Sequence, residues 1–217
     1  MILIPVKSLS TAKQRLARLF DQPTRTELAK TMLQDVAEVL DSWSARPAVS
    51  LVTNDPFAME LARHFDFEVI PEHENRGETY AIEMATRVCE QREVDSTLVI
   101  PGDIPLIEVW ELEKIMEAAP VEGSVLVPAS DGRGSNAVFR RPAGLFPLRF
   151  GNDSFQPHLA AARGTGESCV ILSLPGIALD IDNPADLRQL AAAPGETRSQ
   201  RLVRQWDLSE LSLAANE

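Results

Sequence analysis

Two aspartates late in the sequence, Asp180 and Asp182, have the spacing best suited to chemistry. In an extended segment, alternation places both carboxylates on one face. Two like charges held that close repel each other, and a divalent cation between them removes the repulsion. Magnesium takes oxygen ligands, usually one or two carboxylates together with substrate phosphates. The alternative is that Asp182 or Asn183 only caps a helix begun by Pro184, and both roles can hold at once. Asp186 is expected at the surface of that helix's first turn.

A third acid, Asp103, lies in the segment Pro-Gly-Asp-Ile-Pro at residues 101–105. Its backbone is constrained by the neighbouring glycine and prolines, which suits a metal ligand. The alternative is an aspartate that caps the next helix. Because that helix is expected to begin a few residues later, the sequence favours the metal ligand.

Three cations, Lys7, Lys13 and Arg15, follow the first apolar run within nine residues. Lysine supplies a point charge and arginine a planar set of donors, so this loop suits a triphosphate. It lacks the glycine-rich pattern that ends in Gly-Lys-Ser/Thr. A solvated basic turn that opens a helix explains these residues equally well.

Two loops of small polar residues, 130–136 and 150–155, offer backbone amides and hydroxyls to an anion. The second leads into a helix, whose N-terminus attracts negative charge. The same residue types also build ordinary turns. His158, one turn into that helix, either points toward the site or packs as an ordinary buried or surface histidine.

Short apolar runs alternate with longer amphipathic segments along most of the chain, which predicts an α/β domain with a mostly parallel sheet. Glycine and proline become dense after residue 130, so a mixed sheet is expected. Because ligands of open α/β sheets sit at the carboxyl ends of the strands, the charged loops above are in the right places. Strands are predicted at residues 2–6, 49–53, 67–70, 97–100, 124–127, 137–139 and 169–172, and helices at 24–43, 56–64, 78–91, 107–119, 155–163 and 184–192.

Residues 1–192 are predicted to form one domain, and residues 193–217 a C-terminal extension. The segment after residue 193 resembles a linker. Residues 202–213 are expected to form a helix that packs on the body or on a second subunit, or to be loosely attached. A homodimer is therefore one arrangement that the sequence allows.

The composition and charge of the chain indicate which classes of partner are unexpected. The 217 residues carry a formal net charge of -11, which makes nucleic acid an unexpected partner, since binding it requires a basic face. A small anionic substrate needs only a few cations. The apolar N-terminal run is too short for a signal peptide or a membrane span. The sequence therefore predicts a cytoplasmic protein that does not bind membranes.

Taken in order, these segments resemble the guanylyltransferases of deazaflavin coenzyme F-420 biosynthesis, the CofC/FbiD family. The resemblance covers residues 4–187 and rests on five blocks: 4–16, 101–105, 131–136, 150–155 with His158, and 179–184. It implies a single-domain GT-A-like nucleotidyltransferase fold with helices flanking a mostly parallel, mixed sheet. It also implies transfer of GMP from GTP to 2-phospho-L-lactate, phosphoenolpyruvate or 3-phospho-D-glycerate, with release of pyrophosphate.

The resemblance also assigns residues. It implies that the magnesium ligands are Asp103, Asp180 and Asp182, and that the acceptor acid is held by Ser135, Gly151 and Ser154. The nucleotide would be bound by Lys7, Lys13, Arg15, Gly77 and Pro101, with Lys7, Lys13 and Asp103 predicted to be catalytic.

This sequence departs from the family pattern at two places. The family usually has threonine where this chain has Ser135, and it commonly reads Leu-Asn-Ala where this chain has Glu-Thr-Tyr at residues 78–80. The resemblance implies that the second segment lies near the nucleotide base or ribose, so this change leaves the preference for base or acceptor open. Three alternatives remain: a sugar-phosphate or molybdenum-cofactor nucleotidyltransferase, a glycosyltransferase that uses the Asp-x-Asp pair, and a non-catalytic nucleotide-binding relative.

Overall fold

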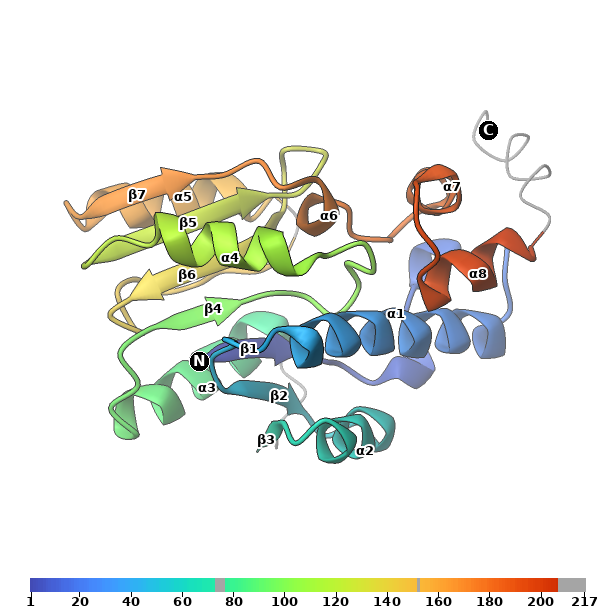
Figure 1. Cartoon of the computed structure of the whole chain (residues 1–217), viewed down its shortest axis with the longest axis horizontal. Coiled ribbons are helices and arrows are strands. Elements are labelled where there is room, and N and C mark those ends of the chain that lie inside the picture. Colours follow the sequence, from blue (N-terminus) through green and yellow to red (C-terminus); the bar gives the residue numbers. More distant parts are fainter. Residues whose placement is uncertain (73–76, 152, 207–217) are drawn as a thin grey trace.

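Ile2, Leu3 and Ile4 have no exposed surface, because their strand lies inside a seven-stranded sheet covered on both faces. Figure 1 shows this sheet in a computed structural model, which describes residues 1–72, 77–151 and 153–206. The strand order is β3-β2-β1-β4-β6-β5-β7. The strands are β1 (Ile2–Pro5), β2 (Val49–Thr53), β3 (Glu68–Pro71), β4 (Thr97–Val99), β5 (Gly123–Pro128), β6 (Ser135–Arg141) and β7 (Ser168–Ile171).

The sheet is mixed because of β6, which pairs antiparallel with both β4 and β5, whereas the other neighbouring strands pair in parallel. A short loop joins β5 to β6, and such a connection returns the chain antiparallel. Within that loop, Asp131 Oδ1 accepts hydrogen bonds from the backbone N–H groups of Arg133 and Gly134. The Asp131 side chain therefore stabilises the turn that leads into Ser135 at the start of β6.

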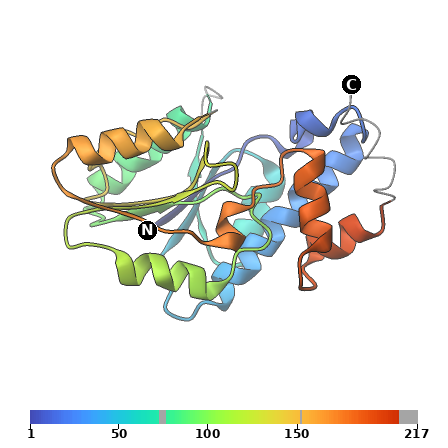
Figure 2. The ribbon, with the colours of Figure 1, turned by 90° about the horizontal axis from the view of Figure 1, so that it is seen from above.

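Helices cover both faces of the sheet (Figure 2). One apolar cluster packs α1, α2 and α4 on one face, and a second packs α3 and α5 on the other. The bounds are α1 (Gln22–Ser42), α2 (Pro56–His64), α3 (Glu78–Gln91), α4 (Val109–Ala118), α5 (Phe155–Gly164), α6 (Pro175–Ala178), α7 (Pro184–Ala192) and α8 (Arg198–Arg204), with 3-10 turns η1 (Leu9–Thr11) and η2 (Gln14–Leu16).

A third apolar cluster lies beyond the end of the sheet, where α7 and α8 pack beside α1 (Figures 1 and 2). It joins Leu16, directly after Arg15, to Leu179 and Ile181, which alternate with the two late aspartates along the chain. Val203 of α8 is completely buried in the same cluster, and the rings of Phe20 and Trp206 pack 4.7 Å apart beside it. The C-terminal helices therefore support both halves of the charged region.

The α/β class and the mixed, mostly parallel sheet predicted from the sequence are confirmed. Each predicted strand and helix exists, with ends that differ by a few residues. The sequence did not predict η1, η2 and α6, which are too short to show a hydrophobic period. A helix was expected at residues 202–213, but α8 runs from Arg198 to Arg204, and residues 207–217 lie outside the described part.

Candidate active site

The charged loops meet at the carboxyl end of the central strands. Lys7, Lys13 and Arg15 follow β1, and Asp103 follows β4, its direct neighbour in the sheet. The backbone N–H of Ile181 donates to the Asp103 carbonyl oxygen at 3.1 Å, which ties the late acid segment to the β4 loop. Residues from three distant parts of the chain therefore surround one site.

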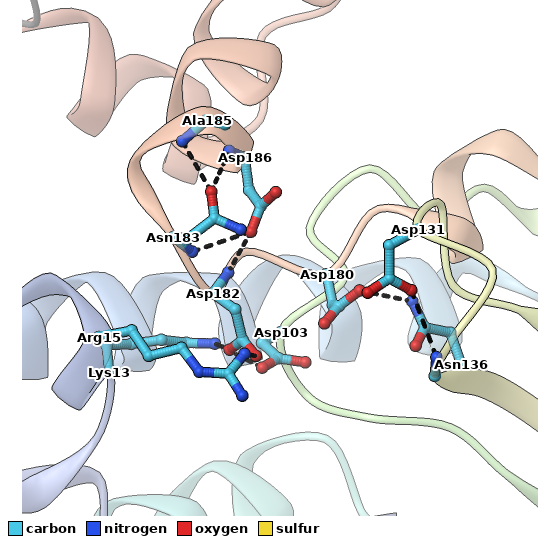
Figure 3. A network of polar contacts seen from close by, with 11 residues as sticks. Lys13, Arg15, Asp103, Asp131, Asn136, Asp180, Asp182, Asn183, Ala185 and Asp186 are labelled. Atoms are coloured by element: carbon cyan, nitrogen blue, oxygen red, sulfur yellow. Dashed lines mark hydrogen bonds and ion pairs between the residues drawn. The ribbon is translucent and has the colours of Figure 1, made fainter. Parts of the chain in front are cut away.

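Lys13 is the centre of this arrangement (Figure 3). Its ammonium donates to Asp103 Oδ2 at 2.5 Å and to Asp182 Oδ1 at 3.0 Å, and its side chain is only 7% exposed. Burial alone lowers the pKa of Lys13, but Asp103 and Asp182 outweigh it, so the pKa is held above its usual range. Arg15 Nη1 adds a second cation 2.9 Å from Asp182 Oδ2. Burial alone raises the pKa of Asp182, yet Lys13 and Arg15 bring it below its usual range.

Asp180 points toward β6 and is held by an amide (Figure 3). Asn136 Nδ2 donates to Asp180 Oδ1 at 2.9 Å and also lies 3.0 Å from the carbonyl oxygens of Ile177 and Ala178. Burial, and then the charges of Asp103 and Asp182, raise the pKa of Asp180 to about 6, against the hydrogen bond from Asn136. Asp180 thus faces the same region as the other two acids but has a different partner.

The hydrogen bonds at the helix N-termini show which acids serve as caps and which keep their carboxylates available to a ligand. Asn183 Oδ1 accepts from the backbone N–H groups of Ala185 and Asp186, so Asn183 caps α7 and leaves the Asp182 carboxylate free of that role. Asp186, expected to be a plain surface residue, instead accepts from the backbone N–H groups of Asp182 and Asn183. Asp103 is no cap either, because α4 has Glu108 at its N-cap position.

Lys7 has a partner that the sequence did not indicate. Its ammonium lies 2.7 Å from Glu72 Oε1, and Glu72 is 3% exposed, at the end of β3. Glu72 follows the edge strand β3, and its ion pair therefore fixes the Lys7 side chain, which lines the first pocket described below.

Two pockets open beside the charged residues. The first, about 450 Å³, lies along the basic loop, and the second, about 520 Å³, lies along the β5–β6 loop and the start of α5. Their walls have in common the residues Arg15, Glu78, Pro101, Asp103 and Asp182. Two ligands placed one in each pocket would meet at the acids.

Lys7 and Lys13 line the first pocket, while Ser135, Gly151 and Ser154 line the second together with Asp180. Gly151 has a φ of 127°, a backbone conformation that strongly favours glycine. Gly77, predicted to bind nucleotide, lines neither pocket and lies at the N-cap of α3 with a φ of 103°.

Glu78 is a further acid in the wall that the two pockets share. Burial, followed by the charge of Asp103, raises the pKa of Glu78 to about 7, while Lys7 acts in the opposite direction. The next residue, Thr79, exchanges hydrogen bonds with the backbone of Phe150: its Oγ1 accepts from the N–H at 2.9 Å and donates to the carbonyl at 3.2 Å. The segment that departs from the family pattern therefore connects the acids to the loop of the second pocket.

Magnesium was predicted from three acids, and the carboxylate oxygens of Asp103, Asp180 and Asp182 around the second pocket are donors of the kind that magnesium takes. Within the described ranges, however, no three histidine, cysteine or acidic side chains stand close enough together to hold a metal as they are. Lys13 lies between Asp103 and Asp182. The metal stays a prediction.

Comparison with known proteins agrees with this geometry. The family model described as "Guanylyl transferase CofC like" matches residues 1–212. The chain belongs to this family. Its members are transferases, so the two adjoining pockets belong to a guanylyltransferase, as the order of the sequence motifs implied.

The chain is similar to curated relatives that are named for different acceptors. It is 32% identical to a phosphoenolpyruvate guanylyltransferase of Roseiflexus castenholzii over 94% of this chain and 93% of that one. It is 31% identical to a 3-phospho-D-glycerate guanylyltransferase of Colwellia psychrerythraea (88% and 90%). It is 30% identical to a 2-phospho-L-lactate guanylyltransferase of Methanothermobacter thermautotrophicus (93% and 88%).

Among solved structures, the fold resembles a putative nucleotide-diphospho-sugar transferase from Desulfovibrio desulfuricans, with a TM-score of 0.76 and 18% identity over 94% of this chain and 93% of that one. At this identity the likeness concerns the fold alone. No helix in the described ranges is both long and apolar enough to span a membrane.

Proposed function

We propose that this guanylyltransferase moves GMP from GTP to the phosphate of a small phosphorylated carboxylic acid and releases pyrophosphate. The observation that carries the proposal is the pair of pockets that meet at Asp103 and Asp182. The first pocket is lined by the three cations of the basic loop. The second has the hydroxyls of Ser135 and Ser154 and the amide of Asn136, and its wall also includes two arginines and several acids. Such a pair suits a charged donor and a smaller anionic acceptor, whose reacting atoms come together at the shared wall.

GTP would occupy the first pocket. Lys7, Lys13 and Arg15 would face its phosphates, because cations on lysine and arginine bind phosphate oxygens strongly. Lys13 is paired with two acids of the shared wall, so its charge is fixed where the α-phosphate would react. Fixed charges in a partly buried site stabilise developing charge without reorganising.

The acceptor would occupy the second pocket. Ser135 and Ser154 supply hydroxyls, and Gly151 leaves the backbone open to close approach. An oxygen of the acceptor phosphate attacks the α-phosphorus of GTP, the new P–O bond forms, and the bond between the α-phosphorus and the bridging oxygen breaks. The electron pair leaves with pyrophosphate. A phosphate monoester is largely ionised near neutral pH, since its second pKa is about 6, so no strong base is required.

Magnesium, when bound, would neutralise phosphate charge, and Asp103, Asp180 and Asp182 are the residues that would hold it. The raised pKa of Asp180 supports this assignment: after burial, its causes are the two other acids, whose repulsion a divalent cation would relieve. Catalysis by the chain itself rests on positioning of the two phosphates and on the fixed charges around them.

The candidate acceptors are the three for which the relatives are named: phosphoenolpyruvate, 3-phospho-D-glycerate and 2-phospho-L-lactate. The reaction would serve coenzyme F-420 biosynthesis. The chain is nearly equally similar to relatives named for each of them. All three are phosphorylated three-carbon acids that differ in a double bond, a hydroxyl or the position of the phosphate. The cytoplasmic location and the homodimer stay predictions.

The test is pyrophosphate release together with mass spectrometry of the products from GTP and a mixture of the three acids, with ATP and CTP in parallel reactions. A GMP adduct of one acid and stoichiometric pyrophosphate are expected. A product formed from a nucleotide-sugar without pyrophosphate would instead identify a sugar transferase. Metal-dependent GTP binding without turnover of any acid would identify a non-catalytic relative.

A further inference from the structure

His158 lies beneath the second pocket and contacts the backbone on one side and a pocket residue on the other. It belongs to α5 and is 1% exposed. Its Nε2 lies 2.9 Å from the backbone nitrogen of Arg149, and its Nδ1 lies 2.9 Å from Ser135 Oγ. Phe150 packs against the ring edge-on, with 5.1 Å between the ring centroids. The imidazole is thus fixed in its plane.

These two contacts determine where the ring carries its proton. A backbone N–H can only donate, so Nε2 must accept from Arg149 and is unprotonated. Burial, with a smaller contribution from the charge of Arg140, lowers the pKa of His158 to about 4, so the ring is neutral at neutral pH. A neutral imidazole without a proton on Nε2 carries it on Nδ1. The Nδ1–H group therefore donates to Ser135 Oγ.

The hydrogen bond from His158 also determines where the Ser135 hydroxyl can place its own proton. Because Ser135 Oγ accepts from His158, its own O–H proton must point elsewhere, and Ser135 lines the second pocket. Ser154 is in a similar state, since its Oγ accepts from the backbone N–H of Ser135 at 3.0 Å. Both serines are more than nine-tenths buried, and both can turn an O–H donor toward a ligand in that pocket.

We propose that His158 is a positioning residue, which holds the Ser135 hydroxyl as a hydrogen-bond donor toward an anionic oxygen of the acceptor. A hydroxyl can otherwise rotate and present either its proton or its lone pairs. Fixing it as a donor favours an anion and disfavours a ligand that itself must donate at that point. The inference rests on the proposed function for the nature of the ligand, while the tautomer of His158 does not depend on it.

The first experiment measures the tautomer directly. Nitrogen NMR of the full chain labelled with ¹⁵N in histidine distinguishes a protonated from an unprotonated ring nitrogen, and the His158→Phe variant assigns the signal. At pH 7 without substrate, we expect a protonated Nδ1 and an unprotonated Nε2. A proton on Nε2 would reverse the hydrogen bond to Ser135 and overturn the proposal.

The second experiment measures initial rates with GTP and the acceptor varied separately. His158→Phe, which keeps a ring but no donor, should raise the acceptor KM about 10- to 100-fold, the loss expected for a hydrogen bond to a charged group. The KM for GTP should change less than about twofold. His158→Asn places an amide N–H near the position of Nδ1 and should recover part of the loss. The exposed His64 at the end of α2 provides the control variant, His64→Gln.

Ser135→Ala separates this role from simple packing. If His158 acts through the Ser135 hydroxyl, the double variant Ser135→Ala/His158→Phe should have the acceptor KM of Ser135→Ala alone. Additive effects, or equal losses for GTP and acceptor, would show a structural role and overturn the proposal. If the unaltered chain released no pyrophosphate with any of the three acids, the proposed function would fail, and the tautomer spectrum would still decide the state of His158.

Discussion

Lys13 Nζ lies 3.0 Å from Asp182 Oδ1, although the two residues are 169 positions apart in the chain. The same ammonium also bonds to Asp103, so one buried cation neutralises acids from two separate loops. In a metal-free site this cation reduces the repulsion that two close carboxylates would otherwise feel.

Removing that cation should affect both catalysis and folding. Lys13→Met is expected to lower kcat about 100-fold or more, because a fixed charge at the reacting phosphates is lost. It should also lower the free energy of unfolding, since Asp103 loses this cation and Asp182 keeps only Arg15. Steady-state kinetics and urea denaturation measure the two effects. Lys114→Met, at an exposed ion pair on α4, is the matched control and should leave both unchanged. Normal turnover in Lys13→Met would exclude Lys13 from the reaction.

Neutralising the acids should stop the reaction while the fold is kept. Asp103→Asn and Asp182→Asn are each expected to abolish turnover at any magnesium concentration, with an unchanged circular dichroism spectrum. Asp41→Asn serves as the control, because Asp41 is about half exposed on α1 and far from the pockets. Near-normal rates for either site variant with magnesium present would show that the metal assignment is wrong.

The stability of the fold should depend on the protonation of His158. Its pKa is about 4 in the folded chain and about 6.5 when unfolded, so the unfolded chain binds more protons between these values. The free energy of unfolding should therefore fall as the pH drops from 6.5 toward 4, by about 2 kcal/mol at pH 5. Above pH 6.5 the ring is neutral in both states and its contribution is constant.

Urea denaturation of the unaltered chain and of His158→Asn at pH 7 and pH 5 measures this contribution. Comparing the two proteins cancels the other groups that titrate in this range, such as Asp180 and Glu78. The variant should lose less stability between the two pH values. An equal loss in both proteins would mean that His158 is not the group responsible.

The cap of α7 should matter for the adjacent acid. Asn183→Ala removes the acceptor of two backbone N–H groups and should cost about 0.5–2 kcal/mol of stability. Because Asp182 precedes the cap directly, we also expect a lower kcat. Asp21→Ala removes the N-cap of α1 and is the control, with a similar loss of stability and normal turnover at a temperature where both fold. Equal activity in the two variants would show that the cap does not position Asp182.

The sequence predicted the strands and helices well because helices such as α1 carry an apolar stripe and buried strands such as β2 are short apolar runs. It also located the acids and cations, since these follow buried strands. It did not predict that Lys13 lies between Asp103 and Asp182, because a side chain's partner across the sheet depends on the register of β1 and β4. The sequence did not predict the pairing of Lys7 with Glu72 or the hydrogen bonds of His158 for the same reason. Each of these contacts joins residues that only the folded chain brings together.

The apolar cluster at the end of the sheet has a consequence for biosynthesis. Leu16 beside the basic loop, Leu179 and Ile181 beside the late acids, and Val203 near the C-terminus share one core. A nascent chain that has emerged only as far as α5 contains Lys13 and Asp103 but neither Asp182 nor the core that holds them together. The three acids and Lys13 therefore cannot come together before the segment that carries Asp182 has been synthesised.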